Sequence, residues 1–217
     1  MAIATVLPSR QPRSGPVQVT LGQFIRFESA AGNRRVQVVD DIRTQGEWDE
    51  QKDYYLQLRR QIASQVRTGS LDPKSLGIFA TTVHDKKRDR YGAVAAGLER
   101  FRRAHRVEVL GVPARVLWSE EGLRVSADPE ATLRIDGDRY ATKLYLLKDE
   151  LEPNTVIAAL QLLRETHRLP GARVAILDCE RGRLIRDTRL NAHSPLVLRL
   201  TAGNFANTWT ALEVGQQ

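Results

Sequence analysis

The chain has 217 residues, of which 41% are hydrophobic and 27% charged, and no apolar run is long enough to span a bilayer, which excludes a transmembrane protein. Its 33 Lys and Arg outnumber its 26 Asp and Glu, and the formal charge of +7 favours an acidic partner such as DNA or RNA, although arginine also aids solubility. The single cysteine, Cys179, excludes an internal disulfide and indicates a cytoplasmic protein.

The N-terminal part of the chain is expected to be mainly helical. Residues 1–16 lack the long apolar stretch of a secretion signal and are expected to form a flexible lead, and residues 17–85 an N-terminal helical region. In chain order, the predicted elements are a helix over 21–30 capped by Thr20, a strand over 35–42, a helix over 47–67 and a short helix over 73–79.

Residues 86–217 carry the clearest succession of helix and strand patterns. The Asp136-Gly137 pair predicts a hairpin, and the apolar run over 173–179 predicts a buried strand that pairs in parallel. In chain order, the expected elements are a helix over 91–105, strands over 115–119, 123–126, 132–135 and 140–147, a helix that begins at Pro153, the strand over 173–179, and a C-terminal helix opened by Ser194 and Pro195. This succession predicts the α/β class, and its order is αβββαβ.

Two acidic residues and a lysine in this segment could carry metal-dependent chemistry. Asp128 lies just before a proline at the end of one strand, Glu130 follows two residues later, and Lys143 is in the next strand but one. Strand alternation places Lys143 on the same face as Ala141 and Tyr145. Metal-dependent nucleases hold a divalent cation between carboxylates and place a lysine beside it. Asp128 and Glu130 are therefore candidate ligands of Mg²⁺ or Mn²⁺, and Lys143 is the candidate that positions water or stabilises phosphate charge.

With this element order and these residues, the segment 91–179 resembles the PD-(D/E)XK nuclease superfamily. Asp128 matches the first acid of the family and Lys143 matches its lysine. The resemblance implies a restriction-endonuclease-like αβββαβ core, here with an N-terminal helical region and a C-terminal helix around it. It also implies Asp128, Glu130 and Lys143 as catalytic residues.

The family pattern places an Asp or Glu two residues before the lysine, and this chain has Ala141 there. The second acid would then be Glu130, or Glu152 or Glu165 of the following helix. The alternative is that the Asp-Pro-Glu sequence is an ordinary turn and that Lys143 protects an exposed strand from aggregation.

A basic cluster brackets the helix over 91–105 and could bind nucleic-acid phosphates. Its members are Lys86, Lys87, Arg88, Arg90, Arg100, Arg102, Arg103 and Arg106. The alternative is a solvated helix face whose charges pair with Asp85, Asp89 and Glu99. Trp48, Tyr54 and Tyr55 could stack on unpaired bases, but their spacing is typical of core residues.

The remaining reactive side chains give weaker signals. The four histidines lack the spacing of zinc ligands, and Cys179 lies in an apolar strand, as expected for a core residue. Asp178 and Glu180 flank Cys179 at a strand end, where a third acid could lie.

The sequence thus favours a nucleic-acid-binding protein with a nuclease-like core, and leaves open whether it is a divergent metal-dependent nuclease or a derivative that no longer cleaves. The alternative is a protein-interaction or assembly module without nucleic-acid chemistry. Salt dependence separates the two, because phosphate binding weakens steeply with salt and an apolar protein interface does not.

Overall fold

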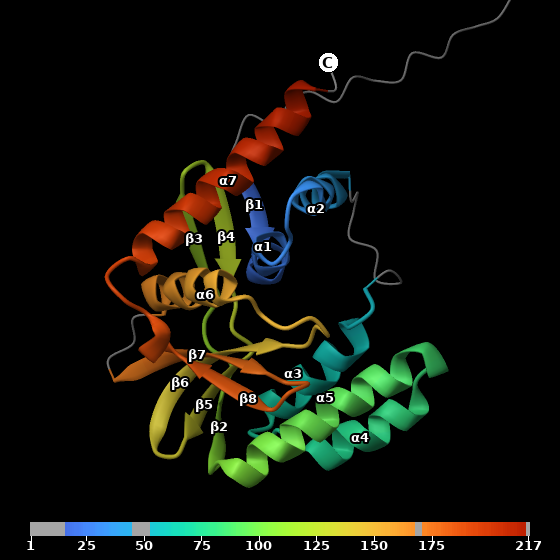
Figure 1. Ribbon diagram of the computed structural model, residues 1–217. Helices are drawn as coiled ribbons and strands as arrows, with labels where there is room; N and C mark the ends of the chain where they lie inside the picture. Colours follow the sequence, from blue (N-terminus) through green and yellow to red (C-terminus); the bar gives the residue numbers. More distant parts are fainter. Residues whose placement is uncertain (1–15, 45–52, 168–170, 216–217) are drawn as a thin grey trace, which may run out of the picture.

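The computed structural model describes residues 16–44, 53–167 and 171–215, and Figure 1 shows their arrangement. The flexible lead, except Pro16, and Trp48 lie outside the described residues. In chain order the elements are β1 (Val17–Thr20), α1 (Leu21–Glu28), α2 (Asn33–Thr44), α3 (Leu56–Arg67), α4 (Pro73–Thr82), α5 (Asp85–Ala104), β2 (Val107–Gly111), β3 (Val116–Glu120), β4 (Leu123–Ala127), β5 (Ala131–Ile135), β6 (Asp138–Tyr145), α6 (Pro153–Thr166), β7 (Ala172–Asp178), β8 (Arg183–Arg186), a 3₁₀ turn (Asp187–Arg189) and α7 (Ser194–Val214). The predicted α/β class is confirmed.

The described strands form two sheets, one with the order β1-β4-β3 and one with the order β2-β5-β6-β7-β8. In the five-stranded sheet, β2, β5 and β6 pair antiparallel, β6 and β7 pair in parallel, and β8 returns antiparallel to β7. Asp136 and Gly137 connect β5 to β6 with φ of 53° and 100°, as a two-residue hairpin turn requires. The predicted hairpin and the predicted parallel pairing are both confirmed.

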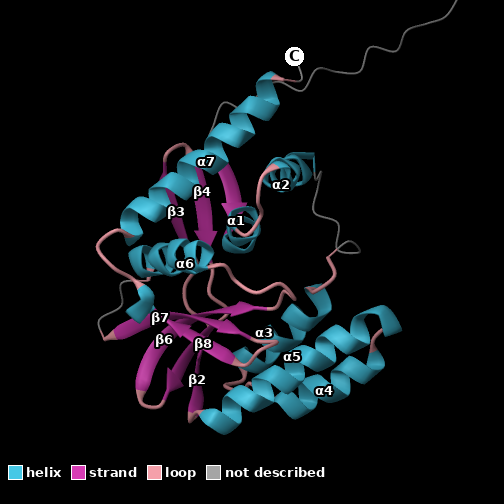
Figure 2. Cartoon of the chain, in the orientation of Figure 1, coloured by secondary structure: helices cyan, strands magenta, loops and turns pink. Residues whose placement is uncertain are grey.

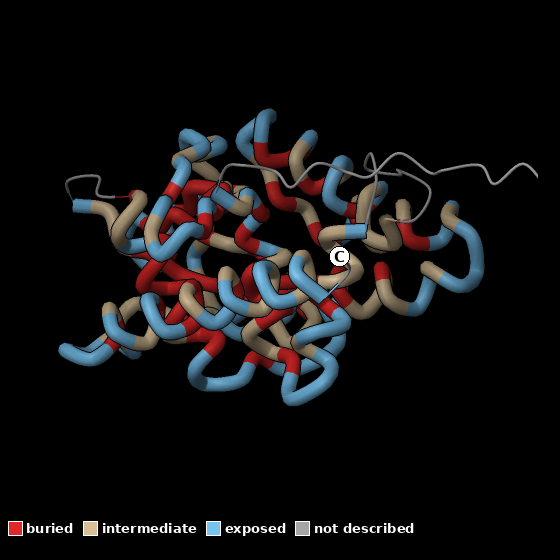
Figure 3. Tube along the Cα trace, turned by 90° about the horizontal axis from the view of Figure 1, so that it is seen from above, coloured by how far each residue is buried: buried red, intermediate tan, exposed pale blue. Residues whose placement is uncertain are grey.

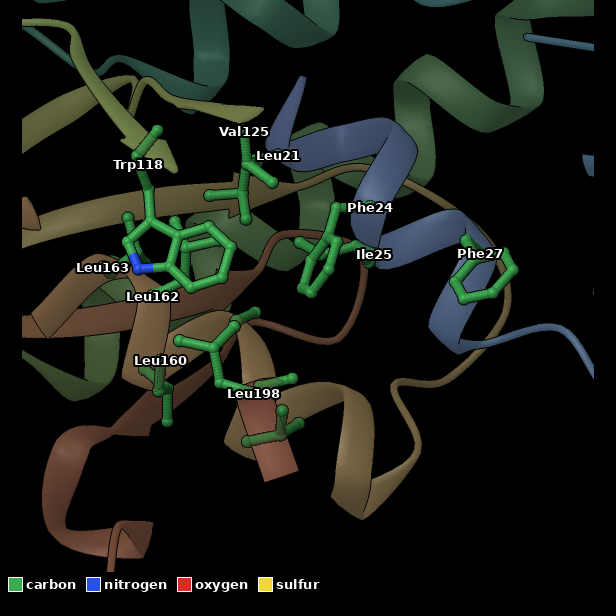
Figure 4. Close-up of a cluster of buried hydrophobic side chains, with 14 of the residues drawn as sticks. Leu21, Phe24, Ile25, Phe27, Trp118, Val125, Leu160, Leu162, Leu163 and Leu198 are labelled. Atoms are coloured by element: carbon green, nitrogen blue, oxygen red, sulfur yellow. The ribbon is translucent and has the colours of Figure 1, made fainter. Parts of the chain in front are cut away.

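Helix α6 lies between the two sheets (Figure 1). Its sequence is apolar around most of its circumference, and such a helix is stable in water only when it is covered on all sides. One side contacts β7 and the other contacts β3, β4 and α7. Figure 4 shows Trp118 of β3 beside Leu162 and Leu163 of α6. One hydrophobic cluster therefore continues from the five-stranded sheet through α6 to the three-stranded sheet.

The opposite face of the five-stranded sheet is covered by α3, α4 and α5, with a second hydrophobic cluster between them (Figure 2). Tyr91 and Phe101 of α5 are completely buried in it. At Gly97, α5 passes so close to the turn between β7 and β8 that a Cβ atom would lie under 3.0 Å from backbone atoms of Cys179 and Glu180. A glycine is therefore needed at this crossing.

The first elements of the chain pack on the three-stranded sheet rather than with α3 and α4. Thr20 caps α1 as predicted, and its side chain accepts a hydrogen bond from the Gln23 N–H. Strand β1 pairs in parallel with β4, and Phe27 of α1 packs edge to face on Phe205 of α7. The segment 17–85 is thus divided between two sides of the molecule. Figure 3, seen from above, shows the buried segments mainly toward the middle of the molecule and exposed ones at its rim.

One predicted strand is wrong, and two others are confirmed in a separate sheet. The strand predicted over 35–42 is part of α2, in which Val38, Val39 and Ile42 share a helical face against the core while Val36 is exposed. The strands predicted over 115–119 and 123–126 are confirmed, but they lie outside the five-stranded sheet. They form the β3–β4 hairpin of the three-stranded sheet, and the first strand of the large sheet is the unpredicted β2.

The helix predicted over 47–67 is confirmed from Leu56, and its residues 47–52 lie outside the described part of the chain. The helices predicted over 73–79 and 91–105, the helix that begins at Pro153 and the C-terminal helix are confirmed, and α4 and α5 are longer than predicted. Among the described helices, none has the length and apolar content that crossing a membrane would take.

Glu28, at the end of α1, is expected to make stability depend on pH. Burial raises the pKa of its carboxyl, against the opposing effects of Arg35 and of a hydrogen bond from Thr201. Because the folded pKa exceeds the unfolded one, the protonated side chain favours folding below the unfolded pKa, and this contribution is lost as the pH rises through the folded pKa.

We therefore expect Glu28→Gln to match the wild type near pH 4 and to be more stable by up to about 1 kcal/mol at pH 7. Arg35 keeps two other acceptors, the carbonyl oxygens of Ala30 and Glu28. Urea unfolding at the two pH values measures the difference. A variant that is less stable than the wild type at pH 7 would show that the ion pair outweighs the cost of burying the charge.

Candidate functional site

The register of the β5–β6 hairpin brings Glu130 and Lys143 together. Ala131 pairs with Thr142, so the residue before β5 lies beside the residue after Thr142. One carboxylate oxygen of Glu130 forms an ion pair with the Lys143 ammonium, and the other accepts a hydrogen bond from the Leu144 N–H at 2.7 Å. The side chains of Lys143 and Glu130 are only 14% and 21% exposed. Both oxygens of this carboxylate are therefore engaged within the protein.

Asp128 does not join this pair. Its Oδ1 accepts a hydrogen bond from the Ser126 hydroxyl at 2.6 Å, and Ser126 in turn accepts one from Arg115 Nε. It makes no ion pair or hydrogen bond with Lys143 among the described residues. The charge of Asp128 acts to raise the pKa of the buried His167, but burial outweighs this effect and lowers it. The structure thus separates the two predicted metal ligands into different environments.

The position two residues before Lys143, where the family pattern has an acid, is occupied by a buried core residue. Ala141 is 1% exposed and belongs to the same cluster as Tyr145, Val174 and Ile176. Within the described residues, no group of three or more His, Cys, Asp or Glu side chains could hold a metal ion. Carboxylate oxygens are the donors that Mg²⁺ and Mn²⁺ prefer, and here those of Glu130 are taken by an ammonium and an N–H. The donor set does not fit the metal that the resemblance implies.

The other candidate acids are also engaged elsewhere or stand apart. Glu165 accepts hydrogen bonds from Trp118 Nε1 and from Gln161, and the exposed Glu152 precedes α6 without a side-chain capping bond. Asp178 is fully buried and pairs with Arg181 at 3.1 Å. Glu180 accepts two hydrogen bonds from Arg90, at 3.0 and 3.2 Å.

No protein-family model and no curated protein matches this chain. Its function therefore has to be argued from its own residues.

The predicted basic cluster is divided by the way α5 packs. In its first half, Lys87 lies over the ring of Tyr54, Arg88 pairs with Asp85, and Arg90 pairs with Glu180. These three cations thus contact side chains of the protein itself, either within α5 or in segments packed against it. Residues 86–90, which the sequence placed before the helix, lie within it.

In the second half, Arg100 and Arg102 donate to carbonyl oxygens of Glu180 and Leu71. Arg103 pairs with Glu99 on the surface. The side chains of Lys86 and Arg106 make no ion pair with any described residue. Most of the cluster is thus used internally, which is the alternative that the sequence analysis left open.

The other predicted residues have structural environments. Cys179 is fully buried, and burial raises the pKa of its thiol well above the usual value, as do the charges of Glu130 and Asp178. The expectation that it is a core residue is confirmed. Tyr54 and Tyr55 pack on Tyr91, so these two aromatic side chains are part of the core boundary rather than a free stacking surface.

Proposed function

We propose that this protein binds nucleic acid with a restriction-endonuclease-like core that does not cleave its ligand. The observation that carries the proposal is the order of elements on the five-stranded sheet. Helix α5, strands β2, β5 and β6, helix α6 and strand β7 follow one another in the αβββαβ order, and the β3–β4 hairpin is an insertion. This topology supports a nuclease-like core, although fold alone does not establish function.

The chemistry around Lys143 supports loss of cleavage. Metal-assisted phosphodiester hydrolysis needs a cation that activates water and offsets phosphate charge. Here Lys143 is neutralised by Glu130, and Ala141 offers a methyl group where an acid would be needed. The pair is suited to holding the end of β6 to the residue before β5.

The charge of the chain supports a polyanion as ligand. The formal charge is +7, and Arg is the main cation, with the planar donor fork that suits phosphate. The competing function is protein interaction, favoured by Leu196 and Leu200, which lie one turn apart on α7 and are 56% and 59% exposed.

The test is to measure binding and cleavage of labelled single-stranded and double-stranded DNA and RNA. We expect the wild type to bind, with an affinity that falls steeply with salt, and to show no cleavage with Mg²⁺ or Mn²⁺. The melting temperature should also be unchanged by these ions, since a ligand stabilises only a protein that binds it.

Metal-dependent cleavage that disappears in both Asp128→Ala and Lys143→Ala would contradict the non-cleaving assignment. Absence of binding to every probe would contradict the whole proposal. Binding of a protein partner that is insensitive to salt and lost in Leu196→Ser would then support the competing function.

A further inference from the structure

We propose that the phosphate backbone of the nucleic acid is bound at the C-terminal half of α5, in a hollow that this helix forms with the start of α4. The inference rests on the proposed function and gives it a location. The hollow is lined by Ser70, Asp72, Pro73, Lys74, Glu99, Arg102 and Arg103. Lys74, which the sequence analysis did not identify as a binding residue, comes from α4 and is brought to the helix only by the fold.

The hollow has a fixed frame. Arg102 donates a hydrogen bond to the Leu71 carbonyl at 2.6 Å and so ties α5 to the loop before α4. Asp72 caps α4, and its oxygens accept hydrogen bonds from the N–H groups of Lys74 and Ser75. The negative charge of Asp72 is thus directed to the backbone of α4.

The cations of the hollow are available to a ligand. The Lys74 side chain has no ion-pair partner among the described residues. Arg103 pairs with Glu99 at 3.0 Å, but its side chain is 77% exposed, and exposed pairs contribute little. Arg106 lies two residues beyond Ala104, the last residue of α5. It is exposed and has no ion pair with any described residue. Lys74, Arg103 and Arg106 therefore each lack a strong internal partner.

The first half of α5 offers a matched comparison. Its three successive cations, Lys86, Lys87 and Arg88, carry the same total charge as Lys74, Arg103 and Arg106. Lys87 lies over the ring of Tyr54, and Arg88 forms an exposed pair with Asp85. The hollow also has no aromatic lining residue on which a base could stack. This favours contacts to phosphate rather than to bases, and hence little preference for sequence.

The experiment compares two triple variants with the same change in charge. One is Lys74→Gln/Arg103→Gln/Arg106→Gln, which changes two lining residues of the hollow and Arg106 just beyond α5. The other is Lys86→Gln/Lys87→Gln/Arg88→Gln at the start of α5. Fluorescence anisotropy with a labelled DNA duplex, at several salt concentrations, measures affinity and its salt slope. We expect the hollow variant to bind at least about tenfold more weakly and to lower the slope of log K against log salt by about 2 to 3. The other variant should lose less than about threefold.

The outcomes separate this inference from the proposed function. If the wild type binds and both variants lose affinity equally, or the variant at the start of α5 loses more, the location is wrong and the function stands. If the wild type binds no nucleic acid, the function itself fails. Circular dichroism verifies folding, and the single exposed substitutions Lys74→Gln and Arg106→Gln, each expected to lower the slope by about 1, replace the triple variant if it unfolds.

Discussion

Replacing Gly97 by alanine is expected to destabilise the protein by at least about 2 kcal/mol. The new methyl group would lie under 3.0 Å from backbone atoms of Cys179 and Glu180 in the turn between β7 and β8. Backbone atoms cannot move aside as a flexible side chain can, so α5 and the sheet would have to separate. Gly182 in the same turn has a φ of 65° and faces the Gly97 carbonyl, so the contact is between two backbones. Urea unfolding at neutral pH measures the loss.

Gly92→Ala is the matched control, because it makes the same substitution in the same helix. A Cβ atom at Gly92 has no neighbour within 4 Å. Alanine has the higher helix propensity, so we expect this variant to be more stable by up to about 1 kcal/mol. Equal effects of the two substitutions would show that helix propensity, and not the close crossing, determines the result.

Lys143→Met is expected to destabilise the protein by about 2 to 3 kcal/mol, because it leaves the Glu130 carboxylate mostly buried beside an apolar side chain. Glu130→Gln in the same protein should restore part of this loss, since the amide oxygen still accepts the Leu144 N–H and no longer carries a charge. Urea unfolding of the wild type, the two single variants and the double variant gives the coupling between the side chains.

Additive effects of the two substitutions would contradict the ion pair. If instead Mg²⁺ or Mn²⁺ stabilised the wild type, and EDTA reversed this, the carboxylate would be a metal ligand rather than the partner of Lys143. The double variant then should lose that response. The measurement thus tests the site without depending on any activity.

Helix caps and tight turns could be predicted from the sequence, because they depend on residues close together in the chain. Thr20 with Gln23, and Asp136 with Gly137, act within three residues, so their cap and their turn could be identified from the sequence. That the β3–β4 hairpin belongs to a separate sheet could not be predicted, because its pairing with β1 spans about a hundred residues and depends on packing. Residues 35–42 were taken for a strand because three valines favour strands locally, and packing of α2 on α7 outweighs that preference.

The candidate site could have been predicted more fully. A two-residue turn at Asp136 and Gly137 fixes the hairpin register, and counting outward from it places Glu130 opposite Lys143. Asp128 lies outside the paired residues of β5 and β6, so the register of the hairpin does not predict where its side chain points. The proximity of Lys74 to the C-terminal half of α5 could not be predicted, because α4 approaches α5 only through tertiary packing.

Helix α6 covers one face of the five-stranded sheet and also packs against β3 and β4 of the other sheet. Opening the three-stranded sheet would expose one side of α6, and opening the other would expose the rest, so each half would lose much of the apolar burial that holds it together. We therefore expect the two sheets to unfold together rather than one after the other. A fragment that begins at α5 would lack β1, α1 and α2. Helix α6 would then lose part of its apolar cover, because α1 packs against it. We expect the described part of the chain to unfold as one cooperative unit, with α6 at its centre.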